Sequence, residues 1–281
     1  MSPFDPPPAA LREIVERALA EDLGVSGDIT SIACVPEDAT AKGAFVAREA
    51  GVLAGTAAAG EVFAQVDPAV TAVWAAVDGA GIEVGEHIGD VSGSLRSLLA
   101  AERTALNLLT HCSGIATATR EFVRRAAPVL VRDTRKTLPG LRALQKAAVR
   151  AGGGVNHRDS LSDAVLIKDN HLSAVGVVDA VKQARAAWPG RIIEVECDTL
   201  EQVAQARTAE ADIVLVDNMT PEQVREAVAV LGGAARLEIS GGITLETVAD
   251  YASTGADYVA VGALTHSVRT LDIGLDIIDE R

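Results

Sequence analysis

The residue types best suited to binding chemistry are the basic side chains between Val131 and His171. This stretch holds eight of the 25 lysines and arginines of the chain but only four of its 39 acidic residues. Because the whole chain carries a formal charge of −14, the stretch is a cationic segment within an acidic protein. The contrast indicates a pocket for small, highly charged anions. Nucleic acid would require a broad basic face, which so acidic a chain argues against.

The basic residues of this stretch fall into two sets with different patterns. Arg142, Lys146 and Arg150 recur every four residues, which is typical of the solvated face of an amphipathic helix. The others lie in segments that resemble turns and strand ends, where side chains commonly face a ligand. This second set, which we predict to bind the anion, consists of Arg132, Arg135, Lys136, His157, Arg158 and Lys168.

From Val129 onward, short apolar segments alternate with helical patterns. Such runs are typical of buried parallel strands in a βα barrel, although six strands are predicted here and a complete barrel has eight. The predicted strands span residues 129–132, 164–168, 191–196, 212–217, 236–240 and 257–261. Their carboxyl ends would ring one mouth, where barrel enzymes have their active sites, and they carry Arg132, Lys168, Glu196, Asp217, Ser240 and Gly262.

Two glycine-containing turns after the last two predicted strands indicate a phosphate site. Glycine lets backbone N–H groups approach a ligand, and the start of a helix favours an anion. The first turn, SGGIT, contains Ser240, Gly241 and Gly242, and the second, VGALTHS, contains Gly262 and His266.

Glu196 and Asp217 are carboxylates at consecutive strand ends of an otherwise cationic mouth. They could bind sugar hydroxyls, hold a magnesium ion or stabilise a cationic transition state. They could also be structural partners of arginine and lysine. A functional role is favoured because a pocket of cations alone would repel a developing oxocarbenium ion.

The segment before the barrel pattern has the features of a small α/β domain. A helical pattern at residues 11–23 ends at Gly24, and short β-rich runs with glycine turns occupy residues 41–94. A long helical segment then extends from about residue 94 to residue 127, with Ser113-Gly114 as a candidate break. This helix is predicted to connect two domains.

Several classes of protein are disfavoured by what the sequence lacks. It has no apolar run long enough to span a bilayer, and its first residues lack the pattern of a signal peptide, so we expect neither a membrane protein nor an exported one. No Walker loop and no strand–GxGxxG–helix unit is found. Three cysteines without a CxxC pair suggest neither disulfides nor zinc and favour the reducing cytoplasm: Cys34, Cys112 and Cys197.

The motifs RDTRKTLPGLR, GGGVNHR and LIKDNH, in this order, closely resemble those of the quinolinate phosphoribosyltransferases. The resemblance covers nearly the whole chain, from EDLGVSGDIT to VGALTHS, and Cys197 in EVEC is a small departure. It implies an N-terminal α/β sandwich domain, placed at 1–110, and an incomplete βα barrel at 111–267, with the tail 268–281 as a candidate to rejoin the first domain. It also implies a homodimer with shared active sites, within a higher assembly in some cases.

The resemblance further implies a reaction and a role for each matching residue. Quinolinate and 5-phosphoribosyl-1-pyrophosphate would give nicotinate mononucleotide, pyrophosphate and CO₂, with Mg²⁺ as cofactor. Lys136 would face the pyrophosphate, while Glu196 and Asp217 would bind ribose hydroxyls and Mg²⁺ and, with Lys168, form the catalytic set. Quinolinate would be held by Arg103, Arg135, His157, Arg158 and Lys168. The 5-phosphate would be held by Ser240, Gly241, Gly242, Gly262 and His266.

Two alternatives fit the same pattern. A paralogue on this scaffold could use a different aromatic acid or phosphosugar, because a fold and its phosphate sites do not determine the acceptor. A catalytically silent sensor could bind phosphorylated ligands without turnover. The presence of Lys168, Glu196 and Asp217 argues against the sensor.

Overall fold

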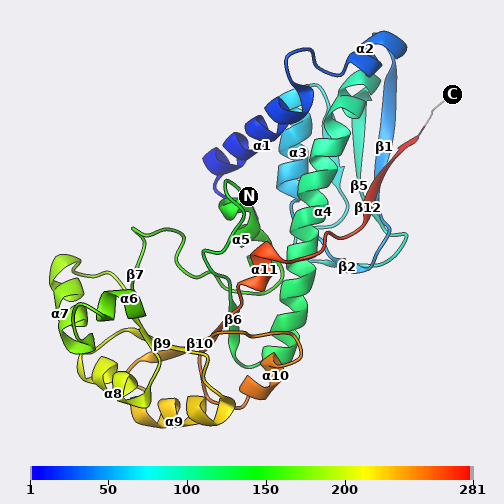
Figure 1. Cartoon of the computed structure of the whole chain (residues 1–281). Coiled ribbons are helices and arrows are strands. Elements are labelled where there is room, and N and C mark those ends of the chain that lie inside the picture. Colours follow the sequence, from blue (N-terminus) through cyan, green and yellow to red (C-terminus); the bar gives the residue numbers. More distant parts are fainter. Residues whose placement is uncertain (1, 279–281) are drawn as a thin grey trace. The chain divides into compact units, whose positions relative to one another are not determined.

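The computed structural model describes residues 2–278, whose contacts gather into two compact units (Figure 1). One unit combines the chain up to Arg120 with Thr137–Gly153 and the segment from Leu264 onward. The other combines Glu121–Lys136 with Gly154–Ala263. Each unit is therefore built from separated segments, and the single boundary between residues 110 and 111 stays a prediction.

The first unit is built on an antiparallel sheet of order β12-β1-β5-β3. Its strands are β1 (Thr40–Ala47), β3 (Thr71–Trp74), β5 (His87–Ser94) and β12 (Ile273–Ile278), and a second, two-stranded sheet pairs β2 (Gly51–Val52) with β4 (Gly81–Ile82). Alternate side chains of β1 are buried, and Phe45 lies 6.1 Å from Phe63 of helix α3 (Thr56–Val66) and 4.9 Å from Trp74 between ring centroids. Helix α1 (Pro8–Leu23) packs against α3. Helix and sheet thus form the α/β domain predicted for the N-terminal part.

The long helical segment is one continuous helix, α4 (Leu95–Ala126), so the candidate break at Ser113-Gly114 is wrong. Gly114 serves a different purpose there. A Cβ atom on Gly114 would lie 2.1 Å from the carbonyl oxygen of Arg269. The glycine therefore lets the chain that leads to β12 lie directly on the helix, and β12 then pairs with β1.

The expectation of a solvated basic stripe on helix α5 (Arg142–Ala151) is also wrong. Lys146 is only 2% exposed. Arg142 donates to the hydroxyl of Thr137 at 3.0 Å, and Arg150 donates to the carbonyl of Asp5 at 3.0 Å. The four-residue spacing predicted the helix correctly, but it could not indicate which face of the helix is buried by packing.

The second unit contains the predicted parallel strands. They are β6 (Leu130–Arg132), β7 (Val165–Ile167), β8 (Ile193–Cys197), β9 (Ile213–Asp217), β10 (Arg236–Ser240) and β11 (Tyr258–Ala260), in the order β6-β11-β10-β9-β8-β7. Because β6 and β7 are the two ends of this order, the barrel is incomplete, as predicted. Figure 1 shows the helices that follow the strands on the outer side of the sheet: α7 (Val177–Ala187), α8 (Leu200–Thr208) and α9 (Pro221–Leu231).

The sequence defines two of these helix starts clearly. Thr199 and Thr220 each accept a hydrogen bond from the backbone N–H three residues later, and the side chains of Gln202 and Gln223 each accept one from the backbone N–H of the capping residue. These reciprocal bonds satisfy N–H groups that a helix start leaves unpaired. In residues 2–278, no helix combines the length and the apolar character needed to cross a bilayer.

Candidate active site

A cavity of about 200 Å³ lies in the second unit, among residues of the parallel strands and of neighbouring loops. Thr134, Leu166, Leu215, Glu238 and Ala260 belong to its lining and were not predicted. Seven of the predicted site residues line it as well: Arg135, Lys136, His157, Arg158, Lys168, Glu196 and Ser240. The structure therefore brings five of the six residues predicted to bind the anion to one cavity, and Arg132 is the one that does not line it.

Strand geometry explains how these side chains meet. Residues two apart in a strand face the same side, so Glu194 and Glu196 of β8 point inward together. Parallel register places Glu196 beside Leu215 of β9. It also pairs Ser240 at the end of β10 with Asp217 at the end of β9.

The cavity carries more positive than negative side chains. Four cationic residues line it, against the carboxylates of Glu196 and Glu238. Lys168 forms an ion pair with Glu196. Burial, followed by the nearby charge of Arg135, lowers the pKa of Arg158, because a second cation in a dry site is unfavourable. An anionic ligand would relieve this repulsion.

Asp133 is a positioning residue that the sequence analysis did not identify. Its carboxylate is fully buried and accepts a hydrogen bond from the backbone N–H of His157 at 2.9 Å. The side-chain amide of Asn156 donates to the same carboxylate. Asp133 thereby fixes the GGGVNHR segment against β6. The only signal in the sequence was an acidic residue between two arginines.

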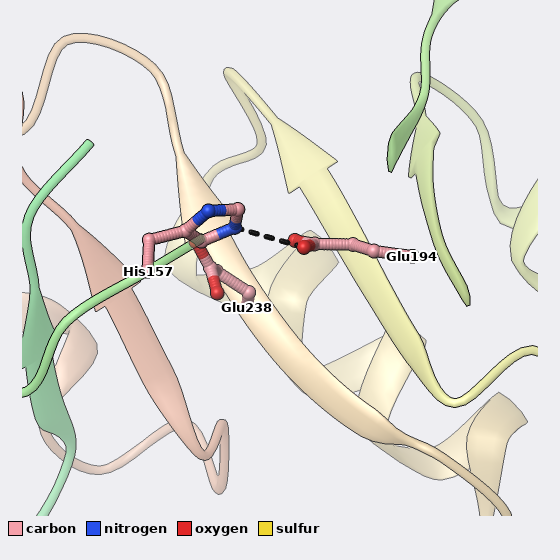
Figure 2. A group of neighbouring side chains, drawn as sticks. All are labelled: His157, Glu194 and Glu238. Carbon is pink, nitrogen blue, oxygen red and sulfur yellow. Dashed lines mark hydrogen bonds and ion pairs between the residues drawn. The ribbon is translucent and has the colours of Figure 1, made fainter. Parts of the chain in front are cut away.

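A buried acidic pair beneath His157 was also missed. The Nε2 atom of His157 lies 2.8 Å from Glu194 and 3.6 Å from Glu238, and Figure 2 shows both carboxyl groups turned toward the ring. Glu194 is 2% exposed and Glu238 is fully buried. Glu238 forms an ion pair with Arg132, whose guanidinium lies 4.5 Å from the ring centre of Tyr258.

The charge environment of Glu238 changes its acidity. Burial and the neighbouring carboxylate of Glu194 raise the pKa of Glu238 to about 7, against the opposite effects of Arg132 and His157. A carboxyl group with this pKa is partly protonated at neutral pH. Such groups are common among catalytic acids.

Two sets of residues have the donor atoms for a metal ion. Glu196 and Asp217 offer carboxylate oxygens from adjacent strands, which suit Mg²⁺, an ion usually held by one or two carboxylates together with substrate phosphates and water. Asp217 accepts a hydrogen bond from Asn218 at 2.6 Å and is not among the cavity lining. His157, Glu194 and Glu238 have ligand atoms within 4.8 Å of one another.

The first predicted phosphate turn contains a glycine that no other residue can replace without strain. Gly241 has a φ of +94°, and a Cβ atom there would lie 2.6 Å from the backbone nitrogen of Asn218. Gly242 has a φ of +60° but open space around it. A side chain at Gly241 would therefore meet both backbone strain and a steric clash, whereas one at Gly242 would meet backbone strain alone.

Gly241→Ala is expected to lower the free energy of unfolding by roughly 2–5 kcal/mol, because the cost of overpacking adds to the strain of a left-handed residue. Gly242→Ala, the matched control, is expected to cost roughly 1–2 kcal/mol because only the strain remains. Urea unfolding of both variants measures the difference. Equal losses would contradict the close approach of Gly241 to Asn218.

Two predicted site residues belong to the other unit. Arg103 is exposed on α4 and lines a groove with Asn107 and His111. His266 ends the short helix α11 (Ala263–His266), and its ring lies 2.6 Å from the hydroxyl of Ser267. Gly262 precedes that helix and is not among the residues that line the cavity.

His171 has a definite structural role. Its Nδ1 atom accepts a hydrogen bond from the backbone N–H of Lys168 at 3.0 Å, at the start of helix α6 (Asp169–Leu172). This bond holds the turn that follows β7, and so it orients the backbone that carries Lys168. Within LIKDNH, Lys168 therefore lines the cavity and His171 stabilises the turn.

Comparison with known proteins identifies relatives over the whole chain. Residues 28–113 match the N-terminal domain and residues 115–276 the C-terminal domain of quinolinate phosphoribosyl transferase. The nicotinate-nucleotide pyrophosphorylase [carboxylating] of Mycobacterium leprae is 50% identical, over 95% of this chain and 97% of that protein. A probable enzyme of the same name from Bacillus subtilis is 42% identical, over 95% and 93%. The crystal structure of NadC from Streptococcus pyogenes matches with a TM-score of 0.93 and 41% identity, over 98% and 99%.

Proposed function

Because the chain belongs to the quinolinate phosphoribosyltransferase family, we propose that it transfers the phosphoribosyl group of 5-phosphoribosyl-1-pyrophosphate to quinolinate. The products are nicotinate mononucleotide, pyrophosphate and CO₂. One observation carries this assignment most directly: four cationic side chains converge on one small cavity with the carboxylate of Glu196. Both substrates are highly charged anions, and their cleavage generates positive charge on the ribose.

The acceptor quinolinate is held by the cations of the cavity. Arg135 and Arg158 offer planar guanidinium groups that match the geometry of a carboxylate, and Lys168 adds a compact charge. His157 lines the same cavity. Leu166, Leu215 and Ala260 provide the apolar wall on which an aromatic ring can lie. Binding thus fixes the pyridine nitrogen for attack on the ribose.

The donor is held by the carboxylates and the glycine turns. Glu196 and Asp217 bind ribose hydroxyls and would hold Mg²⁺, which supplies neutralisation of the pyrophosphate when bound. Lys136 faces the pyrophosphate. The 5-phosphate is held by Ser240, Gly241, Gly242 and Gly262, while a role for His266, which belongs to the other unit, stays a prediction.

The chemistry needs positioning and charge neutralisation rather than a covalent nucleophile. As pyrophosphate leaves, the carboxylate of Glu196 stabilises the positive charge that develops on the ribose. The pyridine nitrogen then bonds to that carbon and becomes cationic. This charge draws electrons from the ring, so the adjacent carboxylate leaves as CO₂ and the ring carbon takes up a proton.

A turnover assay with quinolinate, 5-phosphoribosyl-1-pyrophosphate and Mg²⁺ tests the function. We expect pyrophosphate, CO₂ and nicotinate mononucleotide in equal amounts. Pyrophosphate release with another aromatic acid but not with quinolinate would support a paralogue. Binding of the substrates without any release of pyrophosphate would support a sensor.

We also propose a homodimer in which Arg103 serves the active site of the partner subunit. Mixed dimers test this arrangement, because an isologous dimer exchanges residues in both directions. Arg103→Ala and Lys168→Ala should each be nearly inactive. After unfolding and refolding the two together, about half of the dimers are mixed and each has one intact site, so roughly a quarter of wild-type activity should return. If mixing restores nothing, Arg103 acts within its own chain.

Cytoplasmic location remains a proposal that rests on the sequence composition. The bacterial relatives carry no location in their names, whereas relatives from Arabidopsis thaliana and Nicotiana tabacum are named chloroplastic and mitochondrial. Fractionation of the source cells, with this protein followed by antibody, would test the assignment.

A further inference from the structure

The proposed reaction requires a proton at a defined place. When the carboxylate leaves as CO₂, the electron pair of the broken C–C bond remains on the ring carbon. Nicotinate mononucleotide carries hydrogen there, so one proton must be delivered to that carbon. A carbanion that waits for a proton can recapture CO₂, and a positioned acid would prevent this.

Most side chains that line the cavity are poor sources of that proton. Arginine does not lose its proton in proteins, which excludes Arg135 and Arg158. Lys168 is held in an ion pair with Glu196. Glu238 is different, because it lines the cavity and is fully buried on β10.

The two oxygens of Glu238 have unlike surroundings. Oε2 is bound by Arg132, whereas Oε1 lies 3.6 Å from His157 and has no hydrogen bond within residues 2–278. A buried carboxylate oxygen without a hydrogen bond is costly, and a proton on Oε1 reduces that cost while Oε2 still accepts from Arg132. The geometry therefore favours a neutral carboxyl group whose proton is on Oε1.

The charged groups that face Glu238 act on its protonation in opposite directions. The carboxylate of Glu194 on β8 favours the neutral carboxyl group, whereas Arg132 on β6 and His157 favour the ionised one. Two carboxylates near one another resist ionising together, and this repulsion adds to burial in raising the pKa of Glu238 to about 7. Arg132 in turn stabilises the carboxylate that remains once the proton has left.

A divalent metal on His157, Glu194 and Glu238 is the competing interpretation, since their ligand atoms lie within 4.8 Å of one another. The guanidinium of Arg132 is already paired with Glu238. Its positive charge would repel a metal ion beside it. The charges of the site therefore suit a proton better than a metal.

Resting on the proposed function, we propose that Glu238 is the general acid that protonates the pyridine carbon vacated by CO₂. The C–C bond to the leaving carboxylate breaks, its electron pair stays on the ring carbon, and that pair takes the proton from Oε1 of Glu238. Glu238 becomes a carboxylate paired with Arg132. It regains a proton from water after the product leaves. Glu194 and His157 are positioning residues for this step.

The test compares wild-type protein with Glu238→Gln, which keeps an acceptor for Arg132 but has no acidic proton. Glu201→Gln, an exposed glutamate on α8, is the matched control. We expect Glu238→Gln to lower kcat roughly 100-fold while the KM for quinolinate changes less than about threefold. In a single turnover, it should release pyrophosphate ahead of CO₂ and accumulate a nucleotide that retains both carboxylates.

The pH profile gives a second readout that a merely structural role would not change. Wild-type kcat should fall as the pH rises through about 7, because Glu238 loses its proton there, and the residual activity of Glu238→Gln should lack that fall. Glu238→Asp should recover part of kcat. If Glu238→Gln does not fold, the wild-type profile and Glu238→Asp decide the matter.

Three results would overturn the proposal. The first is a wild-type kcat that stays constant from pH 6 to 9. The second is that Glu238→Gln releases pyrophosphate and CO₂ together at the wild-type rate. The third is that the wild-type chain binds one divalent metal ion that Glu238→Gln no longer binds. Failure of the wild-type protein to make nicotinate mononucleotide is a different result, because it rejects the proposed function itself. The wild-type assay therefore comes first.

Discussion

Quinolinate should be used roughly 10²- to 10⁴-fold more efficiently than nicotinate, measured as kcat/KM at saturating 5-phosphoribosyl-1-pyrophosphate. The reason is the number of cations that converge on the cavity. The positive charges of Arg135 and Arg158 repel each other, since the charge of Arg135 contributes to the lowered pKa of Arg158. Nicotinate lacks one carboxylate, and removal of the partner of a buried charge costs about 3–5 kcal/mol. This free energy corresponds to the expected ratio of kcat/KM between the two acids.

Picolinate is the matched control for this comparison. Nicotinate lacks the carboxylate next to the ring nitrogen, whereas picolinate lacks the other one. Both should be rejected if the cavity requires two carboxylates. Comparable kcat/KM for quinolinate and either monoacid would contradict the assignment of these cations to the acceptor.

Two simple rules together predicted three of the six strand-end residues at the cavity, whereas Arg132, Asp217 and Gly262 are not among its lining. A buried parallel strand appears as an apolar run, and its carboxyl end lies at the mouth of the barrel. Lys168, Glu196 and Ser240 follow from these rules, and all three line the cavity. The incomplete barrel could be predicted for the same reason, since six strands were counted and six are present.

Residues inside the strands were harder to predict. Glu194 and Glu238 lie in runs that are otherwise apolar, and a barrel interior is usually filled by branched apolar side chains. Their roles depend on His157 and Arg132, which come from distant parts of the sequence. One signal was present, because Glu194 is two residues from Glu196 and must face the same side of the strand.

Position along the chain was also a poor guide to the unit in which a residue lies. Thr137–Gly153 begins directly after Arg135 and Lys136, within the same motif, yet it belongs to the other unit. The solvated stripe expected on α5 was wrong for this reason, since tertiary packing buries Lys146. A role for Arg103 in the partner's site depends on a second chain, and no spacing within one chain can establish it.

Lys168→Ala should lower kcat/KM for quinolinate by roughly 30- to 900-fold, equal to about 2–4 kcal/mol, and leave the protein folded. Lys168 follows strand β7 and its side chain is 44% exposed, so the residue contributes charge to the cavity rather than packing to the core. Its loss removes a cation and also frees the carboxylate of Glu196, which then repels both anionic substrates. Lys182→Ala, an exposed lysine on α7, should retain wild-type kinetics. Activity of Lys168→Ala near the wild-type value would mean that this ion pair lies outside the substrate site.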